Sequence, residues 1–231
     1  MSMKLSWCLG VGTVLVSILL LSAEGQAAFD LRITEIWSGQ DGPDLSPDWA
    51  EVTNVGNMAW TTADGDLYVE DDSGNGGASG LEILVQGISS IGPGEVAIIL
   101  MEGEALDAGD FKFYWDLVKE PDLSLSLIGY AAGSGIGLGG GGDTVNLFLG
   151  DARIHLDSEG YDDAPSGISW DVGLQAYSAA GNASGAMLLA ESETGFGDNI
   201  ASPGMTSVPE PTTMLLIGIG VAGLLVGRRR K

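Results

Sequence analysis

The chain has 231 residues, of which 32 are Asp or Glu and 9 are Lys or Arg, so its formal net charge at pH 7 is −23. Such acidity repels nucleic acid and anionic membrane surfaces, and it excludes nucleic acid as a partner. The only cysteine, Cys8, lies in the first ten residues, so the rest of the chain has neither a disulfide nor a thiol nucleophile.

Residues 1–27 have the three parts of a secretory signal peptide. Lys4 supplies a positive charge, residues 9–21 form an apolar core, and the small residues ending at Ala27 suit cleavage. We expect signal peptidase to cut after Ala27. An uncleaved signal anchor is the alternative, although the apolar run is short for a membrane span.

Residues 28–207 are predicted to form one all-β domain. Short β-type segments alternate with Gly, Pro, Asn and Asp clusters, which is typical of a sandwich or barrel. In chain order the predicted strands are Leu31–Ile36, Trp49–Asn54, Asp66–Glu70, Leu81–Gln86, Val96–Met101, Thr144–Leu149, Ala152–Leu156 and Ala186–Ala190. Only residues 110–118 and the stretch around 124–128 leave room for a helical turn. The glycine runs at 74–80 and 133–142 are expected to serve turns and bulges within this domain.

One acidic loop has the ligand spacing of a calcium site. Counted from Asp71, the oxygen-bearing side chains of Ser73, Asn75 and Glu82 fall at positions 3, 5 and 12, and Gly76 falls at position 6, as in an EF-hand loop. The flanking segments are predicted strands, whereas an EF-hand needs helices. The residues therefore fit either a calcium site or a polar hairpin loop. Calcium is the only cofactor that the sequence suggests.

The sequence contains no convincing catalytic set. His155, the only histidine, would need a nucleophile and an orienting acid, and Asp157 and Ser158 are too close in sequence to build that geometry on a strand. No Gly-x-Ser-x-Gly motif occurs. We therefore predict that the protein is not an enzyme and that it has no catalytic residue.

Five blocks of the exported part resemble the lamin-tail domain. They are Ile33–Ile36, Asp48–Gly56, Ile91–Glu95, Gly139–Leu147 and Ser202–Gly204. The resemblance implies an immunoglobulin-like β-sandwich, a domain found in nuclear lamins and in secreted bacterial proteins. The glycine-rich middle and an insertion at residues 111–126 depart from the family's pattern.

The most specific of these blocks is Asp-Trp-x-Glu-x-x-Asn-x-Gly, formed by Asp48, Trp49, Glu51, Asn54 and Gly56. We expect Trp49 to fill the core, and Asp48 and Glu51 to meet backbone donors or water. Asn54 and Gly56 suit a turn after the strand. All five residues are therefore assigned structural roles.

The C-terminal segment, residues 208–231, has three parts. They are Val208-Pro209-Glu210-Pro211, an apolar run at residues 214–226, and Arg228-Arg229-Arg230-Lys231. The prolines favour an extended start, and the cations would stay on the cytoplasmic side of a membrane. The sixteen residues from Thr212 to Gly227 would give a single apolar helix of about 24 Å, marginal for a permanent span.

This order resembles the PEP-CTERM sorting signal of Gram-negative bacteria. The resemblance implies recognition and cleavage near the Pro-Glu-Pro tripeptide by an exosortase, a membrane transpeptidase, and a link to exopolysaccharide and biofilm. An ordinary single-span anchor is the alternative.

The exported part is more acidic than the whole chain. Five of the 9 basic and two of the 32 acidic residues lie in the two ends, which leaves a charge near −26. This acidity fits a solvated surface, or a protein that binds divalent cations or a cationic partner.

Taken together, the sequence predicts an exported, non-enzymatic β-sandwich module that is held in the inner membrane before processing and then reaches the cell envelope or extracellular matrix. There it would bind or scaffold, with a polysaccharide or another surface protein as its partner. The first alternative is a calcium-dependent adhesive module that uses the loop from Asp71 to Glu82. A hydrolase is the second.

Overall fold

The computed structural model describes residues 28–39, 47–71, 81–116, 127–190 and 197–205. The predicted signal peptide and the sorting tail, including its apolar helix, lie outside these residues. Within them, no helix is long and apolar enough to cross a membrane.

The domain is built on one sheet of ten strands. From one edge to the other, the strands are β10 (Ile154–Tyr161), β9 (Asp143–Leu149), β4 (Leu67–Glu70), β5 (Ile83–Gln86), β8 (Leu127–Ala131), β7 (Val96–Met101), β2 (Trp49–Asn54), β1 (Leu31–Trp37), β11 (Trp170–Asp171) and β12 (Ala176–Tyr177). β7 and β8 are parallel, and the other neighbours in this sheet are antiparallel.

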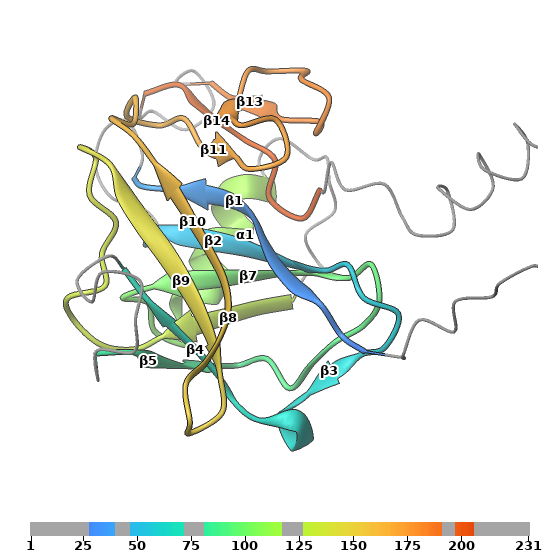
Figure 1. Ribbon diagram of the computed structural model, residues 1–231. Coiled ribbons are helices and arrows are strands. Elements are labelled where there is room, and N and C mark those ends of the chain that lie inside the picture. Colours follow the sequence, from blue (N-terminus) through green and yellow to red (C-terminus); the bar gives the residue numbers. More distant parts are fainter. Residues whose placement is uncertain (1–27, 40–46, 72–80, 117–126, 191–196, 206–231) are drawn as a thin grey trace, which may run out of the picture.

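Two short strand pairs and two helices complete the described part. β13 (Met187–Leu189) pairs with β14 (Asn199–Ala201), and β3 (Trp60–Thr61) pairs with β6 (Ser90–Ile91). A short 3₁₀ helix, η1 (Thr62–Asp64), follows β3, and α1 (Asp107–Asp116) follows β7. Figure 1 shows β11, β13 and β14 together at one end of the domain and β3 at the opposite end.

The large sheet curls around its main hydrophobic core. β9 and β10 cross over β2 and β7 in Figure 1, so that the two halves of the sheet face each other. Alternate residues such as Ile33, Val52, Val69 and Leu147 are buried between the halves, as the period-two pattern of a strand requires. The curl brings β10, one edge of the sheet, against β1.

A second core lies on the other side of β1, β2 and β7, where α1 covers the sheet. The rings of Trp37 and Trp49 stack at a centroid distance of 6.0 Å, and Trp115 of α1 meets Trp37 edge-on at 5.2 Å. Phe111 of α1 meets Trp49 in the same edge-on way. These aromatic side chains fix α1 to the sheet, because such pairs add specific geometry to the burial of apolar surface.

The predicted all-β class is confirmed, and most predicted strands coincide with observed ones. The stretch around residues 124–128 left room for a helical turn, but its described part, from Leu127 on, belongs to β8, which pairs with β5 and β7. Gly129 permits this pairing, since a Cβ there would lie 2.7 Å from the carbonyl oxygen of Gln86. The short strands β3, β6, β11, β12 and β14 were not predicted. The immunoglobulin-like arrangement stays a prediction.

Candidate functional site

Three buried carboxyl groups lie in one row across adjacent strands. Glu35 of β1 is the register partner of Glu51 on β2 and of Asp171 on β11. Glu35 and Asp171 are each 2% exposed, and Glu51 is 0% exposed. A buried charge is costly unless it is paired. The hydrogen-bond partners of these three groups therefore show what part of the fold they stabilise.

Two of the three carboxyl groups hold a turn at the end of the described chain. The backbone N–H of Ser202 donates to Glu35 Oε1 at 2.8 Å, and the backbone N–H of Gly204 donates to Glu51 Oε2 at 2.8 Å. The Met205 N–H closes the turn on the Ser202 carbonyl at 2.9 Å. Pro203 has no N–H, so every backbone donor from residue 202 to 205 is satisfied.

The local sequence explains the shape of this exit turn, residues 202–205. Gly204 has φ of +77°, and it follows Pro203. A type II turn needs a positive φ at its third position and favours proline at its second. Ser-Pro-Gly thus forms the turn, and the two buried glutamates fix it against β1 and β2.

Hydroxyl groups supply the remaining partners of the row. Ser169 Oγ donates to Glu35 Oε1 at 2.5 Å, and Thr34 Oγ1 donates to Glu51 Oε1 at 2.7 Å. Asp171 accepts hydrogen bonds from the backbone of Leu174, at 2.9 Å, and from the hydroxyl of Ser184. Glu35 Oε2 is buried, and none of the described residues forms a hydrogen bond with it. No Lys or Arg among the described residues forms an ion pair with the row.

Burial raises the pKa values of the two glutamates, Glu35 and Glu51. Desolvation raises the pKa of Glu35 to about 7, against the hydrogen bonds from Ser169 and Ser202, which lower it. The pKa of Glu51 is raised well above its ordinary value, first by desolvation and then by the nearby Glu35. Both groups favour the neutral form, in which a carboxyl oxygen still accepts a backbone hydrogen bond.

Buried acids with raised pKa values also occur in acid–base catalysis. Glu35 and Glu51 are nearly inaccessible to solvent, and Glu51 has a hydrogen-bond donor on each oxygen. A substrate could not reach them without displacing the exit turn. The geometry suits an anchor for the C-terminal segment.

The predicted structural residues lie around this anchor. Trp49 is 0% exposed in the aromatic core. Asp48 Oδ2 accepts a hydrogen bond from the backbone N–H of Leu138 at 2.8 Å, and so ties the glycine-rich segment 133–142 to the start of β2. Glu51 accepts from Gly204, as described above.

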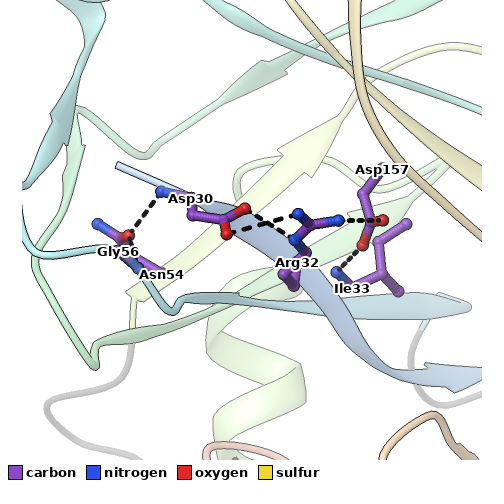
Figure 2. A network of polar contacts seen from close by, with 6 residues as sticks. All are labelled: Asp30, Arg32, Ile33, Asn54, Gly56 and Asp157. Carbon is purple, nitrogen blue, oxygen red and sulfur yellow. Dashed lines mark hydrogen bonds and ion pairs between the residues drawn. The ribbon is translucent and has the colours of Figure 1, made fainter. Parts of the chain in front are cut away.

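Asn54 and Gly56 act together at the other end of β2 (Figure 2). Asn54 Oδ1 accepts from the backbone N–H groups of Asp30, at 3.2 Å, and Gly56, at 3.0 Å. Its Nδ2 donates to the carbonyls of Met58 and Ile91, both at 2.8 Å. A Cβ on Gly56 would lie 2.4 Å from the Ala28 carbonyl oxygen, so this position requires glycine.

Asp157 joins β10, at one edge of the curled sheet, to β1, as Figure 2 also shows. Its Oδ2 accepts a hydrogen bond from the backbone N–H of Ile33 on β1 at 2.8 Å, and its Oδ1 pairs with Arg32 at 3.2 Å. The register of β10 shifts between His155 and Asp157, which marks a bulge. Asp157 thus contributes a carboxylate that fastens β10 to β1.

Of the predicted calcium ligands, Asp71 and Glu82 lie within the described residues, and Ser73 and Asn75 do not. Glu82 pairs with Arg153 at 3.4 Å, and the guanidinium of Arg153 lies 3.3 Å from the ring centroid of Tyr68. In the described ranges, no group of three His, Cys, Asp or Glu side chains is arranged to hold a metal. The calcium site stays a prediction.

His155 lies on the exposed side of β10, where its ring meets Phe148 edge-on at 5.4 Å. The carboxylate of the nearby Asp157 is engaged by Arg32 and Ile33.

Sequence reasoning missed Asp171, the third carboxyl group of the row, and Ser169, which donates a hydrogen bond to Glu35. They lie on or beside the two-residue strand β11, which is too short to leave a periodic pattern. Glu35 and the Ser-Pro-Gly turn were noted only as parts of the lamin-tail resemblance. No signal in the sequence predicted that they would contact each other.

Comparison with known proteins identifies the tail. Residues 207–231 match the PEP-CTERM protein-sorting motif, so the chain has an exosortase-dependent sorting signal that begins two residues after the exit turn. The motif indicates an exported protein whose membrane-anchored precursor is processed toward the cell surface. No curated protein and no solved structure matches the chain.

Proposed function

We propose that the protein is a non-enzymatic β-domain that is displayed at the cell envelope or in the extracellular matrix once exosortase has processed its tail. It acts there by binding or scaffolding, with a polysaccharide or another surface protein as its partner. The observation that carries this proposal is the sorting motif at residues 207–231, which directly follows a turn anchored in the domain. Because Glu35 and Glu51 hold the exit turn, the end of the domain that precedes the sorting signal is fixed to the sheet.

The lamin-tail resemblance supports the same proposal. Three of its blocks, which are far apart in sequence, converge at the anchor: Glu35 comes from the first, Glu51 from the second and the Ser202–Gly204 turn from the last. Because these three blocks contact one another in the fold, we assign them a common structural role. We therefore retain a lamin-tail-like, immunoglobulin-like sandwich as the proposed fold family.

Mass analysis of the mature protein tests the sorting step. Cells with an active exosortase should yield a chain that begins after residue 27 and ends near Val208, without the Arg-rich end. A variant in which Pro209, Glu210 and Pro211 are replaced by alanine should keep its C-terminal residues and stay in the membrane. A mature protein that retains Lys231 in the presence of the exosortase would contradict the proposal.

Calcium-dependent adhesion is the second candidate. The observation in its favour is that Asp71 and Glu82, which border the predicted loop, are both largely buried carboxylates, at 8% and 9% exposure. They flank β4 and β5, which pair through Tyr68 and Leu84. Buried acids at the loop end of this hairpin could serve as ligands of a cation.

A further inference from the structure

The exit turn, residues 202–205, is attached to the sheet through two side chains. Glu35 accepts a hydrogen bond from the backbone of Ser202, and Glu51 accepts one from the backbone of Gly204, both at 2.8 Å. Among the described residues, every hydrogen bond from the turn to another part of the domain ends on one of these two carboxyl groups. The attachment of the turn therefore depends on the protonation state of Glu35 and Glu51.

The chain just before the turn is held in a different way. β14 ends at Ala201, which pairs with Met187 of β13. The Ile200 N–H donates to the Gly167 carbonyl at 2.7 Å, and the Ile200 carbonyl accepts from the Ser169 N–H at 3.0 Å. These backbone pairs contain no titratable group. The turn can therefore open while β14 stays in place.

No described cation compensates a charge on the two glutamates. They are register partners, and Asp171 faces Glu35 from β11 on the other side. These three acids act on one another, and the exit turn adds no titratable group. The exported part has only four basic residues, since five of the nine in the chain lie in the two ends. Two of the four, Arg32 and Arg153, form ion pairs with other acids.

Ionisation of both glutamates would place two like charges side by side in a buried site. The Cβ atoms of register partners on antiparallel strands lie about 4.5 to 5.5 Å apart, and like charges in this position destabilise the pair. Glu35 Oε2 is buried, and none of the described residues forms a hydrogen bond with it. Water can solvate such an oxygen only after the adjacent turn has moved.

The hydrogen bonds to Glu35 do not offset its burial. Donors favour the charged form of a carboxyl group, and those from Ser169 and Ser202 lower the pKa of Glu35. Desolvation raises this pKa by more, to about 7. An ionised Glu35 is therefore more stable in water than under the closed turn.

We propose that Glu35 and Glu51 form a pH-sensitive latch, which holds the exit turn on the sheet at mildly acidic pH and releases it at mildly alkaline pH. In the closed state the neutral carboxyl groups accept hydrogen bonds from the turn. When the pair loses a proton to the solvent, water becomes the better partner and the turn opens. The chain that leads to the sorting signal then begins after Ala201 instead of after Met205. The domain is thereby held less closely to its point of attachment, a consequence that rests on the proposed function.

Proton linkage gives the direction and size of the effect. The closed turn keeps a proton on Glu35 up to about pH 7, whereas the ordinary pKa of a glutamate is 4.5. Opening therefore becomes more favourable as the pH rises from 4.5 to about 7. Between about pH 5.5 and about pH 7.5, the ratio of open to closed turn should rise about tenfold or more.

Hydrogen exchange of the full chain in detergent micelles tests the latch. After correction for intrinsic exchange rates, the protection of the Ser202 and Gly204 amides should fall about tenfold or more between the two pH values. At the higher pH, low concentrations of urea should leave this protection unchanged, because opening a turn exposes little surface. The Ala50 amide in β2 should lose protection with urea, since it exchanges when the whole domain unfolds.

Substitutions of the latch residues should remove the dependence on pH. Glutamine keeps an acceptor oxygen and does not titrate, so Glu35→Gln and Glu51→Gln should each reduce the fall in protection, and the double variant should abolish it. Glu104→Gln, which removes an exposed charge, is the matched control and should behave like the unmutated chain. Equal protection and equal urea dependence of the Gly204 and Ala50 amides at about pH 7.5 would overturn the inference, because the turn would then open only with the whole domain.

The experiment needs no processing enzyme, so it separates the latch from the proposed function. If the turn opens with pH in a chain whose tail exosortase does not cut, the latch is supported and the sorting function fails. If the tail is cut but protection of the turn does not change with pH, the latch fails and the sorting function stands.

Discussion

Glu51 on β2 accepts a hydrogen bond from the backbone N–H of Gly204 at 2.8 Å, across 153 residues of sequence. With the parallel contact between Glu35 and Ser202, it ties the last described residues to the middle of the sheet. A segment held by two buried groups cannot separate from the domain without exposing polar backbone. The sorting signal therefore follows a rigid end of the domain.

The first prediction concerns Glu51. Glu51→Ala leaves the Gly204 N–H and the Thr34 hydroxyl without their acceptor, and we expect the free energy of unfolding to fall by about 3 to 5 kcal/mol. Glu51→Gln should cost about 1 kcal/mol or less, because its amide oxygen can accept from Gly204 while Thr34 Oγ1 accepts from its NH₂ group. Urea unfolding of the exported domain measures both. Equal losses in the two variants would rule out the anchoring role.

A second measurement compares Glu51→Ala with Glu51→Gln at the exit turn itself. Limited proteolysis should cut Glu51→Ala near residues 199–205 before the rest of the domain is degraded, and it should not do so in Glu51→Gln. Uniform degradation of the alanine variant would show that the turn is not the part released.

The second prediction is a dependence of stability on pH. The pKa of Glu35 is about 7 in the folded protein and 4.5 ordinarily, so between these values the folded chain keeps a proton that the unfolded chain has lost. The contribution of Glu35 to the free energy of unfolding is therefore greatest below pH 4.5 and decreases as the pH rises to about 7. The raised pKa of Glu51 acts in the same direction. Unfolding measured at about pH 5 and about pH 8 should show the loss.

Glu35→Gln should flatten this dependence, because the amide keeps an acceptor for Ser169 and Ser202 and does not titrate. Glu104→Gln removes a charge from an exposed side chain and is the matched control. It should leave the slope between the two pH values nearly unchanged. An unchanged slope in Glu35→Gln would mean that the buried row does not carry the effect.

The third prediction concerns closure of the sheet by Asp157. Asp157→Ala removes the acceptor of the Ile33 N–H, and we expect a loss of about 1 to 3 kcal/mol. Asp157→Asn keeps an acceptor and loses only the ion pair with Arg32, for about 1 kcal/mol or less. Hydrogen exchange should show a faster Ile33 amide in the alanine variant alone. A protected Ile33 amide in Asp157→Ala would contradict this assignment.

The fourth prediction concerns Gly56. A methyl group there would meet the backbone of residues 28–30 at distances that real Cβ atoms do not adopt, so Gly56→Ala should destabilise the domain by about 2 kcal/mol or more. Gly140 has open space around it, and Gly140→Ala is the control, expected to change stability by less than about 0.5 kcal/mol. Thermal unfolding compares the two. Similar melting temperatures would show that the segment 28–30 can move aside.

The fifth prediction tests calcium. If Asp71 and Glu82 are ligands, calorimetry should detect calcium binding that Asp71→Ala and Glu82→Ala abolish. Glu82 is paired with Arg153, so Arg153→Ala should strengthen binding by freeing that carboxylate. Asp64→Ala, at an exposed helix end, is the control. The absence of heat from the unmutated protein would exclude the site.

Much of the local structure could be predicted from sequence. β2 and β7 coincide with their predicted ranges, and β1 extends its range by one residue, because alternation of apolar side chains is a local property. β8 could not be predicted, since its pairing with β5 and β7 depends on the close approach of the backbone at Gly129. The strands β11 and β12 have two residues each and depend on β1 for their existence.

The sequence by itself determined where the protein is sent, because a sorting signal is read as a linear order of prolines, apolar residues and cations. It also determined the β class, through the period of its strands. Only the tertiary structure decided what the acidic side chains do. Glu35, Glu51 and Asp171 meet because β1 lies between β2 and β11. Burial then raises the pKa values of Glu35 and Glu51, whose carboxyl oxygens accept backbone hydrogen bonds. Contacts across more than a hundred residues follow from packing, which no local pattern records.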